Sequence, residues 1–227
     1  MTAKDIAPHI EHTLLKPDAT RAAIEKLCAE ARQHRFHCVC VNGSRIVEAR
    51  AFLEESAVKV ATVIGFPLGA VDPDAKRYEV EVAIDNGAHE IDVVLNLGRL
   101  KEGDHAYVLR ELRDVVEAAD ERPVKVILET GYLTAEEKVA ACRIVLDSGA
   151  QFVKTSTGFG PGGATVEDVK LMRETVGAKF GVKAAGGIRD TQTALTMIAA
   201  GANRLGTSSG VAIVAGVASN AGSQPGY

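Results

Sequence analysis

The sequence predicts a single-domain α/β protein built as a (β/α)8 TIM barrel. Short runs rich in valine and isoleucine alternate with amphipathic segments along its 227 residues. Such alternation is typical of parallel strands that are joined by right-handed helical crossovers. Seven of these strands and one short N-terminal candidate make eight strand–helix units, which suits the length of one closed barrel. An open doubly wound sheet is the alternative architecture.

Each expected element can be placed along the chain. Helices end where N-G-A, S-G-A and A-G-A supply glycines that stop a helix. We expect the barrel to occupy residues 1–218, and the closing S-N-A-G-S-Q-P-G-Y to form a flexible tail over 219–227. The predicted strands cover 9–15, 37–41, 58–65, 90–96, 124–130, 151–156, 180–186 and 203–208. The predicted helices include Ala19–His34, Asp74–Asn86, His105–Ala119, Ala135–Asp147 and Val166–Thr175.

The overall composition argues against several classes of protein. The formal net charge of -4 disfavours a general nucleic-acid or membrane-surface binder, because both would need a basic surface. No apolar run approaches the roughly 18 residues of a membrane-spanning helix. The N-terminal M-T-A-K-D-I-A-P-H-I-E-H has no apolar segment of the kind found in signal peptides, so we expect a cytoplasmic protein.

Cysteine and histidine spacing gives no sign of a metal centre. The six histidines are scattered, without H-E-x-x-H or a similar pattern. The cysteines lack a paired C-x-x-C spacing, so we expect buried thiols in a reducing compartment. A metal site assembled from residues far apart in sequence is the alternative. The four cysteines are Cys28, Cys38, Cys40 and Cys142.

Position along a strand separates the lysines into two groups, because the active sites of such barrels lie at the C-terminal ends of the strands. Lys59 and Lys125 lie at the N-terminal ends of their strands, so we interpret them as solvated charges at the end of the barrel opposite the active site. Lys154 and Lys183 lie near the C-terminal ends of their strands, directly before T-S-T-G and A-A-G-G, respectively. A lysine there has to be paired or neutralised, since burying an uncompensated ammonium is very costly.

Asp92 is a carboxylate among apolar residues in the predicted strand E-I-D-V-V-L-N (90–96). One interpretation is purely structural, a buried ion pair with one of the lysines that fixes the strand register. The other is chemical, because perturbed ionisable groups gather at functional sites and three of them would share one barrel mouth.

Two lysines in one pocket suggest a specific chemistry. Each ammonium lowers the pKa of the other, and burial acts in the same direction. A neutral amine can attack a carbonyl group and form a Schiff base, which requires no metal ion. Asp92 would then carry protons. The sequence leaves open whether Lys154 or Lys183 is the nucleophile.

The stretch Q-F-V-K-T-S-T-G-F-G-P-G-G contains a G-x-G-x-x-G match at Gly158, Gly160 and Gly163. A dinucleotide site would need an acidic residue at the end of the next strand to hold the ribose. The charged residue near the end of that strand is a lysine, Lys183, and Pro161 interrupts the loop. We therefore do not expect NAD to bind here.

Two later loops make a better phosphate site. A-A-G-G-I-R (184–189) and L-G-T-S-S-G (205–210) end the last two predicted strands, and a helix is expected to begin near Ser208. Glycines let backbone N–H groups approach a phosphate, and barrels commonly bind phosphate after their last two strands. The alternative is that these loops are only tight turns followed by a capping serine.

Several of these segments together resemble the deoxyribose-phosphate aldolase family, in the same order and over nearly the whole chain. They are E-H-T-L-L-K-P-D-A-T (11–20), E-I-D-V-V-L-N (90–96), F-V-K-T-S-T-G-F (152–159), V-K-A-A-G-G-I-R (182–189) and L-G-T-S-S-G (205–210). The resemblance implies a class I aldolase without metal or cofactor. Such enzymes reversibly cleave 2-deoxy-D-ribose 5-phosphate to D-glyceraldehyde 3-phosphate and acetaldehyde. It also implies a homo-oligomer, either a dimer or a tetramer.

The resemblance assigns roles to individual positions. Lys154 would form the Schiff base, and Asp92 and Lys183 would relay protons. Cys40 matches a cysteine near the reacting carbon that is not the nucleophile, and Tyr227 matches a tyrosine on a mobile tail that assists proton transfer. The positions that match the family's phosphate site are Gly158, Gly186, Gly187, Gly206, Ser208 and Ser209.

Two positions depart from the family pattern. Glu11 stands where the family usually has aspartate, which leaves the role of this longer carboxylate open. Phe159 stands where some members have a phosphate-binding lysine, so backbone amides and the two serines would hold the phosphate. Two functional alternatives remain at this point. One is a different Schiff-base sugar-phosphate aldolase or a transaldolase, and the other is a catalytically silent barrel that binds a phosphorylated sugar.

Overall fold

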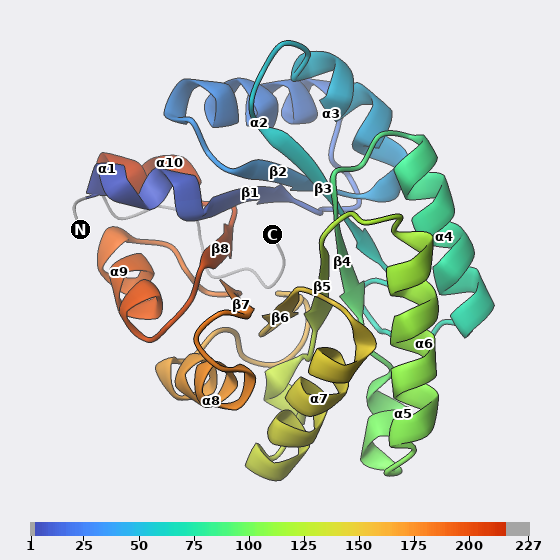
Figure 1. Ribbon diagram of the computed structural model, residues 1–227. Coiled ribbons are helices and arrows are strands. Elements are labelled where there is room, and N and C mark those ends of the chain that lie inside the picture. Colours follow the sequence, from blue (N-terminus) through green and yellow to red (C-terminus); the bar gives the residue numbers. More distant parts are fainter. Residues whose placement is uncertain (1–2, 217–227) are drawn as a thin grey trace.

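The computed structural model describes residues 3–216 and contains a closed barrel of eight parallel strands (Figure 1). Each strand pairs with the next along the chain, and β1 closes the ring by pairing with β8. The (β/α)8 prediction is therefore confirmed, and the open sheet is excluded. The strands are β1 (Ile10–Leu14), β2 (Cys38–Val41), β3 (Lys59–Ile64), β4 (Glu90–Val94), β5 (Val124–Ile127), β6 (Phe152–Lys154), β7 (Gly181–Ala185) and β8 (Arg204–Thr207).

Helices surround the barrel and connect its strands, as the ring of coiled ribbons in Figure 1 shows. Six of them begin after a Thr or Asp whose side chain accepts a hydrogen bond from a backbone N–H of the first turn, which explains where they start. The α-helices are α1 (Ala3–Ile6), α2 (Arg21–His34), α3 (Ile46–Phe52), α4 (Pro73–Asp85), α5 (Leu97–Lys101), α6 (His105–Ala118), α7 (Ala135–Ser148), α8 (Val166–Val176), α9 (Thr191–Ala199) and α10 (Gly210–Ala215). Three short 3-10 helices are η1 (Ala7–His9), η2 (Gly43–Arg45) and η3 (Thr130–Tyr132).

Differences from the predicted elements are concentrated at their ends. The strand predicted over 151–156 stops at Lys154, and the Thr155 hydroxyl takes part in two hydrogen bonds with the backbone of Ala185. The helix expected near Ser208 begins at Gly210. Two short helices, α1 and η1, precede β1 and were not predicted from the sequence. The predicted boundary at residue 218, the tail and Tyr227 lie outside the described residues.

The protein has two separate apolar regions. The larger one fills the space between the strands and the surrounding helices. The smaller one lies inside the barrel and comprises Leu15, Cys38, Cys40, Ala61, Val63 and Ala185, with Phe66 packed against it. All four cysteines are buried and free, as predicted. No helix within residues 3–216 has the length and apolar character needed to cross a membrane.

The strand register determines which charged residues are neighbours. Lys154 of β6 lies opposite Lys183 of β7, and Asp92 of β4 lies opposite Lys125 of β5. Side chains of adjacent strands at the same level share one face of the sheet. The closed barrel therefore brings these four ionisable side chains into its interior.

Candidate active site

Asp92 is the centre of a cluster of charged side chains inside the barrel. The Nζ atom of Lys154 donates to its Oδ2 atom at 2.8 Å, and the Nζ atom of Lys183 donates to the same oxygen at 2.5 Å. Asp92 and Lys183 are completely buried, and Lys154 is 2% exposed. The three residues predicted to do the chemistry therefore meet at one point.

Lys125 is a fourth member of this cluster, and its predicted role as a solvated charge is wrong. Its side chain is fully buried, and its Nζ atom lies 2.9 Å from Oδ1 of Asp92 and 2.6 Å from Oε2 of Glu90. By contrast, the Lys59 side chain is 47% exposed, as predicted. The signal for Glu90 was available, because it stands two residues before Asp92 and therefore on the same face of the strand.

Glu11 completes the cluster from β1. Its Oε2 atom accepts a hydrogen bond from Nζ of Lys183 and lies 3.4 Å from Nζ of Lys125. The residue is fully buried, and its Oε1 atom has no hydrogen-bond partner among the described residues. The longer carboxylate therefore serves as a counter-ion for two lysines. The barrel interior holds three carboxylates and three ammonium groups: Glu11, Glu90, Asp92, Lys125, Lys154 and Lys183.

Burial and neighbouring charges push the pKa values of these groups in different directions. Burial alone would raise the pKa of Asp92, but the ammonium groups around it outweigh burial and hold that pKa well below its usual range. Burial would lower the pKa of Lys183, but the carboxylates of Asp92 and Glu11 raise it above the ordinary lysine value. Asp92 is therefore a carboxylate and Lys183 an ammonium at neutral pH.

Lys154 differs from the other two lysines of the cluster. Burial lowers its pKa, the single carboxylate of Asp92 only partly compensates, and the ammonium of Lys183 lowers it further. The net pKa lies below the ordinary lysine value, whereas the pKa of Lys125 is raised well above it. A neutral amine is therefore more accessible at Lys154 than at the neighbouring lysines, which is the condition for nucleophilic attack on a carbonyl group.

Cys40 lies inside the barrel close to this cluster. Burial raises the pKa of its thiol to about 11, and the charges of Asp92, Lys183 and Lys154 also act on it. The residue is completely buried. A thiol with so high a pKa is a poor nucleophile at neutral pH, in keeping with the expectation that Cys40 does not attack the substrate.

The glycines expected to bind phosphate follow β6 and β7 with backbone conformations suited to close approach. Gly158, Gly186 and Gly187 have φ values of 86°, 92° and 81°. The two loops touch, because the N–H of Ala164 donates to the carbonyl of Gly186 at 3.0 Å. At the end of β8, Gly206 is buried within the strand, Ser208 is exposed and Ser209 precedes α10. All six expected positions therefore lie within β8 or in the loops after the last three strands.

Glu129 supports the loop after Lys154, a role that no sequence pattern indicated. Its carboxylate is 2% exposed and accepts hydrogen bonds from the backbone N–H and the hydroxyl of Thr157. The Thr157 hydroxyl oxygen in turn accepts from the N–H groups of Phe159 and Gly160. This side chain therefore fixes the loop that contains Gly158.

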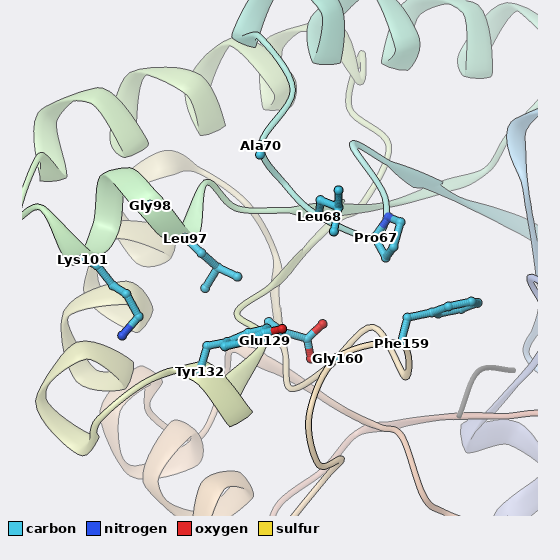
Figure 2. A pocket seen from close by; sticks show the side chains of 10 residues that line it. All are labelled: Pro67, Leu68, Ala70, Leu97, Gly98, Lys101, Glu129, Tyr132, Phe159 and Gly160. Atoms are coloured by element: carbon cyan, nitrogen blue, oxygen red, sulfur yellow. The ribbon is translucent and has the colours of Figure 1, made fainter. Parts of the chain in front are cut away.

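Phe159 faces a hollow of about 400 Å³ between the loops that follow β3, β4, β5 and β6 (Figure 2). Its ring packs edge-on against Phe66 with centroids 5.3 Å apart. Leu97 and Tyr132 line the same hollow, whose wall is mostly apolar. The position of Phe159, where the family resemblance would allow a phosphate-binding lysine, is therefore part of an apolar wall.

One group of side chains in residues 3–216 has ligand atoms close enough to hold a metal ion, namely Glu11, Cys38 and Glu90, within 4.8 Å of one another. The ammonium of Lys125 already contacts both carboxylates. Burial also raises the pKa of the Cys38 thiol well above its usual value. The donor set does not fit a metal, because a cation of the protein itself neutralises it.

The sequence of this chain is similar to those of known aldolases. A family model described as DeoC/LacD family aldolase matches residues 9–217. A deoxyribose-phosphate aldolase from Thermococcus gammatolerans is 57% identical over 220 residues, which cover 95% of this chain and 98% of the relative.

Solved structures give the same result. A tetrameric deoxyribose phosphate aldolase from Aeropyrum pernix matches with a TM-score of 0.88 and 33% identity, over 94% of this chain and 91% of the other. The aldolase QR15 matches with a TM-score of 0.90 and 40% identity, over 93% of this chain and 95% of the other. The chain belongs to the DeoC/LacD family of aldolases.

Proposed function

We propose that the protein is a deoxyribose-phosphate aldolase that uses Lys154 to form a Schiff base. The observation that carries the proposal is that the ammonium groups of Lys154 and Lys183 both contact the same oxygen of Asp92. Lys154 lies at the end of β6, on the face where barrel enzymes have their active sites. The lowered pKa of Lys154 and the raised pKa of Lys183 support Lys154 as the nucleophile. The 57% identity to the Thermococcus gammatolerans enzyme supports the substrate.

The proposed reaction begins with the open-chain aldehyde of 2-deoxy-D-ribose 5-phosphate. The neutral amine of Lys154 adds to C1, and loss of water gives an iminium ion. A base removes the proton of the C3 hydroxyl, the C2–C3 bond breaks, and its electron pair moves into the iminium. D-glyceraldehyde 3-phosphate leaves, and an enamine of acetaldehyde remains on Lys154.

The second half of the reaction returns the enzyme to its starting state. The enamine takes a proton at C2, and water hydrolyses the resulting iminium to acetaldehyde and the free amine. The Asp92 carboxylate and the Lys183 ammonium touch through one oxygen, so they provide an acceptor and a donor side by side for these proton transfers. We assign the proton relay to this pair.

We also assign the substrate phosphate to the loops after β6, β7 and β8. Gly158, Gly186 and Gly187 have no side chains and have positive φ values, a backbone conformation that can turn N–H groups towards an anion. Ser208 and Ser209 would add hydroxyl donors. We propose a cytoplasmic homo-oligomer, a dimer or a tetramer, and the tetrameric relative from Aeropyrum pernix supports an assembly.

Reductive trapping tests this proposal directly. Borohydride with acetaldehyde should add an ethyl group of about 28 Da to Lys154, identified by peptide mass mapping, and EDTA should not reduce the yield. The Lys154→Met variant serves as the blank. Absence of an adduct with both acetaldehyde and deoxyribose 5-phosphate would exclude the mechanism and leave a silent phosphate-binding barrel. Product analysis with deoxyribose 5-phosphate separates this enzyme from other Schiff-base aldolases and transaldolases.

A further inference from the structure

Lys125 lies beneath the proposed site and has no part in the reaction described above. It is the second residue of β5, and its register partner on β4 is Asp92. Its side chain is completely buried, so it has no access to bulk water. A buried lysine in this position has to be explained, because an ammonium is among the most costly groups to bury.

The two oxygens of Asp92 are divided between different partners. Oδ1 accepts from Nζ of Lys125 at 2.9 Å, whereas Oδ2 accepts from Nζ of Lys154 at 2.8 Å and from Nζ of Lys183 at 2.5 Å. The Lys125 ammonium therefore restricts rotation of the carboxylate about its last bond. Without this anchor, Oδ1 could compete with Oδ2 for the same two lysines.

The Lys125 ammonium also balances two further carboxylates. It lies 2.6 Å from Oε2 of Glu90 and 3.4 Å from Oε2 of Glu11. If its charge were removed, these carboxylates would be left without this cation and the field at Lys154 would become more negative. The charged and titratable groups around Lys125 are Glu11 of β1, Cys38 of β2, Glu90 and Asp92 of β4, and Lys183 of β7.

We propose that Lys125 is a positioning residue for the reaction, which anchors Oδ1 of Asp92 so that Oδ2 faces Lys154 and Lys183, and balances the carboxylates beneath them. This inference rests on the proposed Schiff-base function. It requires that Lys125 remain charged, and three carboxylates raise its pKa well above the ordinary value despite burial. Lys125 acts through Asp92 and touches no substrate.

The test compares the pH dependence of imine trapping and of kcat/KM in Lys125→Met and in the wild type. A more negative field favours the ammonium form of Lys154, so the rise of activity with pH should move to higher pH by roughly one unit. At neutral pH this shift is about a tenfold loss of kcat/KM, which alkaline buffer should reverse, leaving the several-fold deficit that the lost anchor on Asp92 causes at every pH.

Lys76→Met is the matched control. Lys76 is also completely buried, and its Nζ atom lies 2.7 Å from Oε1 of Glu111, but it is not part of the barrel cluster. This variant should lose stability without moving the pH profile. An unchanged profile in Lys125→Met, or a loss of activity that is the same at every pH, would overturn the proposal.

A double variant covers the case in which Lys125→Met does not fold. Lys125→Met/Glu90→Gln removes one charge of each sign, so the pH profile should return towards that of the wild type. Its kcat should stay several-fold low, because Oδ1 of Asp92 still lacks its anchor. If the double variant recovered both the wild-type pH profile and the wild-type kcat, the anchoring role would be refuted. Failure of the proposed function is distinguishable, because the wild type itself would then not trap acetaldehyde.

Discussion

The protein has buried lysines in two regions, and the number of carboxylates that each lysine contacts ranges from one to three. Between α4 and α6, Lys76 pairs with Glu111 alone at 2.7 Å and also donates to the carbonyl of Val94. Inside the barrel, Lys125 is within 4.0 Å of three carboxylates and Lys183 of two. Lys154 contacts one.

The direction in which the pKa of each lysine is shifted follows the number of carboxylates that the lysine contacts. Burial lowers the pKa of Lys76 and of Lys154, and in each case one carboxylate does not compensate for the lost hydration. Two or three carboxylates raise the pKa of Lys183 and Lys125 above the ordinary value. A single counter-ion thus leaves a buried lysine easy to deprotonate, and a second counter-ion keeps it charged.

The comparison also shows that a lowered pKa is not sufficient for reactivity. Lys76 belongs to α4, and its ammonium is buried against Glu111 of α6 and the carbonyl of Val94 in β4, whereas Lys154 ends a strand at the face of the barrel where sites form. We therefore place the chemistry at Lys154 and assign Lys76 a structural role.

The largest expected effect is the difference in kcat between variants of Lys154 and of Lys76. Lys154→Met should lower kcat by at least roughly 10⁴-fold, because the variant lacks the nucleophile. Lys76→Met should leave kcat within about twofold of the wild type in the folded fraction, since it does not touch the site. Steady-state cleavage of deoxyribose 5-phosphate measures both. Comparable losses in the two variants would remove the distinction between the two regions.

Asp92→Asn should lower kcat by roughly 10²- to 10⁴-fold, because the proton relay is lost. Lys154 also loses its one carboxylate, so its pKa should fall further and acetaldehyde trapping should continue at lower pH than in the wild type. Trapping and turnover are measured over the same pH series. Equal losses of both would show that Asp92 acts on folding rather than on proton transfer.

Lys76→Met tests the structural assignment by its effect on stability. Removing one partner of a buried pair leaves the Glu111 carboxylate unpaired and should cost about 3–5 kcal/mol of the free energy of unfolding. The double variant Lys76→Met/Glu111→Leu should recover most of this loss. Urea unfolding curves measure the effect, and a double variant as unstable as the single one would contradict the explanation.

Lys183→Ala is expected to produce a smaller effect with a distinct dependence on pH. The folded pKa of Lys154 is lowered partly by this ammonium, so its removal raises that pKa and shifts the rise of activity towards higher pH. At neutral pH we expect roughly a tenfold lower rate of imine trapping, with recovery in alkaline buffer. A pH profile that stays in place would show that burial alone sets the pKa.

The smallest effect is expected outside both regions of buried lysines. Phe159→Lys places a cation beside the loop that contains Gly158 and should lower KM for phosphorylated substrates by a few-fold, with little change in kcat. Phe159→Leu is the apolar control. Since neither change touches Asp92, the pH profile of trapping should remain that of the wild type. A shift in that profile would indicate that the loop and the charged cluster are coupled.

The sequence predicted the barrel and the three central residues for a physical reason. Strands and helices alternate visibly, and Lys154, Asp92 and Lys183 are charges in apolar strands that could not be mistaken for surface residues. The assignment of Lys125 failed because depth in a barrel depends on how far adjacent strands are staggered. That stagger places the second residue of β5 level with the third residue of β4, which no local pattern reveals.

Other parts of the site depend on contacts between distant segments. The support that Glu129 gives to Thr157 joins residues 28 positions apart, and no sequence pattern links Glu129 to the glycine-containing loop in which Thr157 lies. The phosphate loops were predicted from their glycines; Gly158, Gly186 and Gly187 have positive φ values, and the phosphate site itself stays a prediction. The role of Tyr227 stays a prediction, because it lies outside the described residues.

The origin of the six buried charges has a consequence for how the chain assembles. Glu11, Glu90 and Asp92 belong to β1–β4, whereas the three lysines belong to β5–β7. Within this cluster each half of the barrel therefore contributes charges of one sign only, so the clustered charges of a half repel those of its own copy and attract those of the other half. Two fragments divided between β4 and β5 should consequently associate as a heterodimer in preference to either homodimer, because only the mixed complex neutralises its interior.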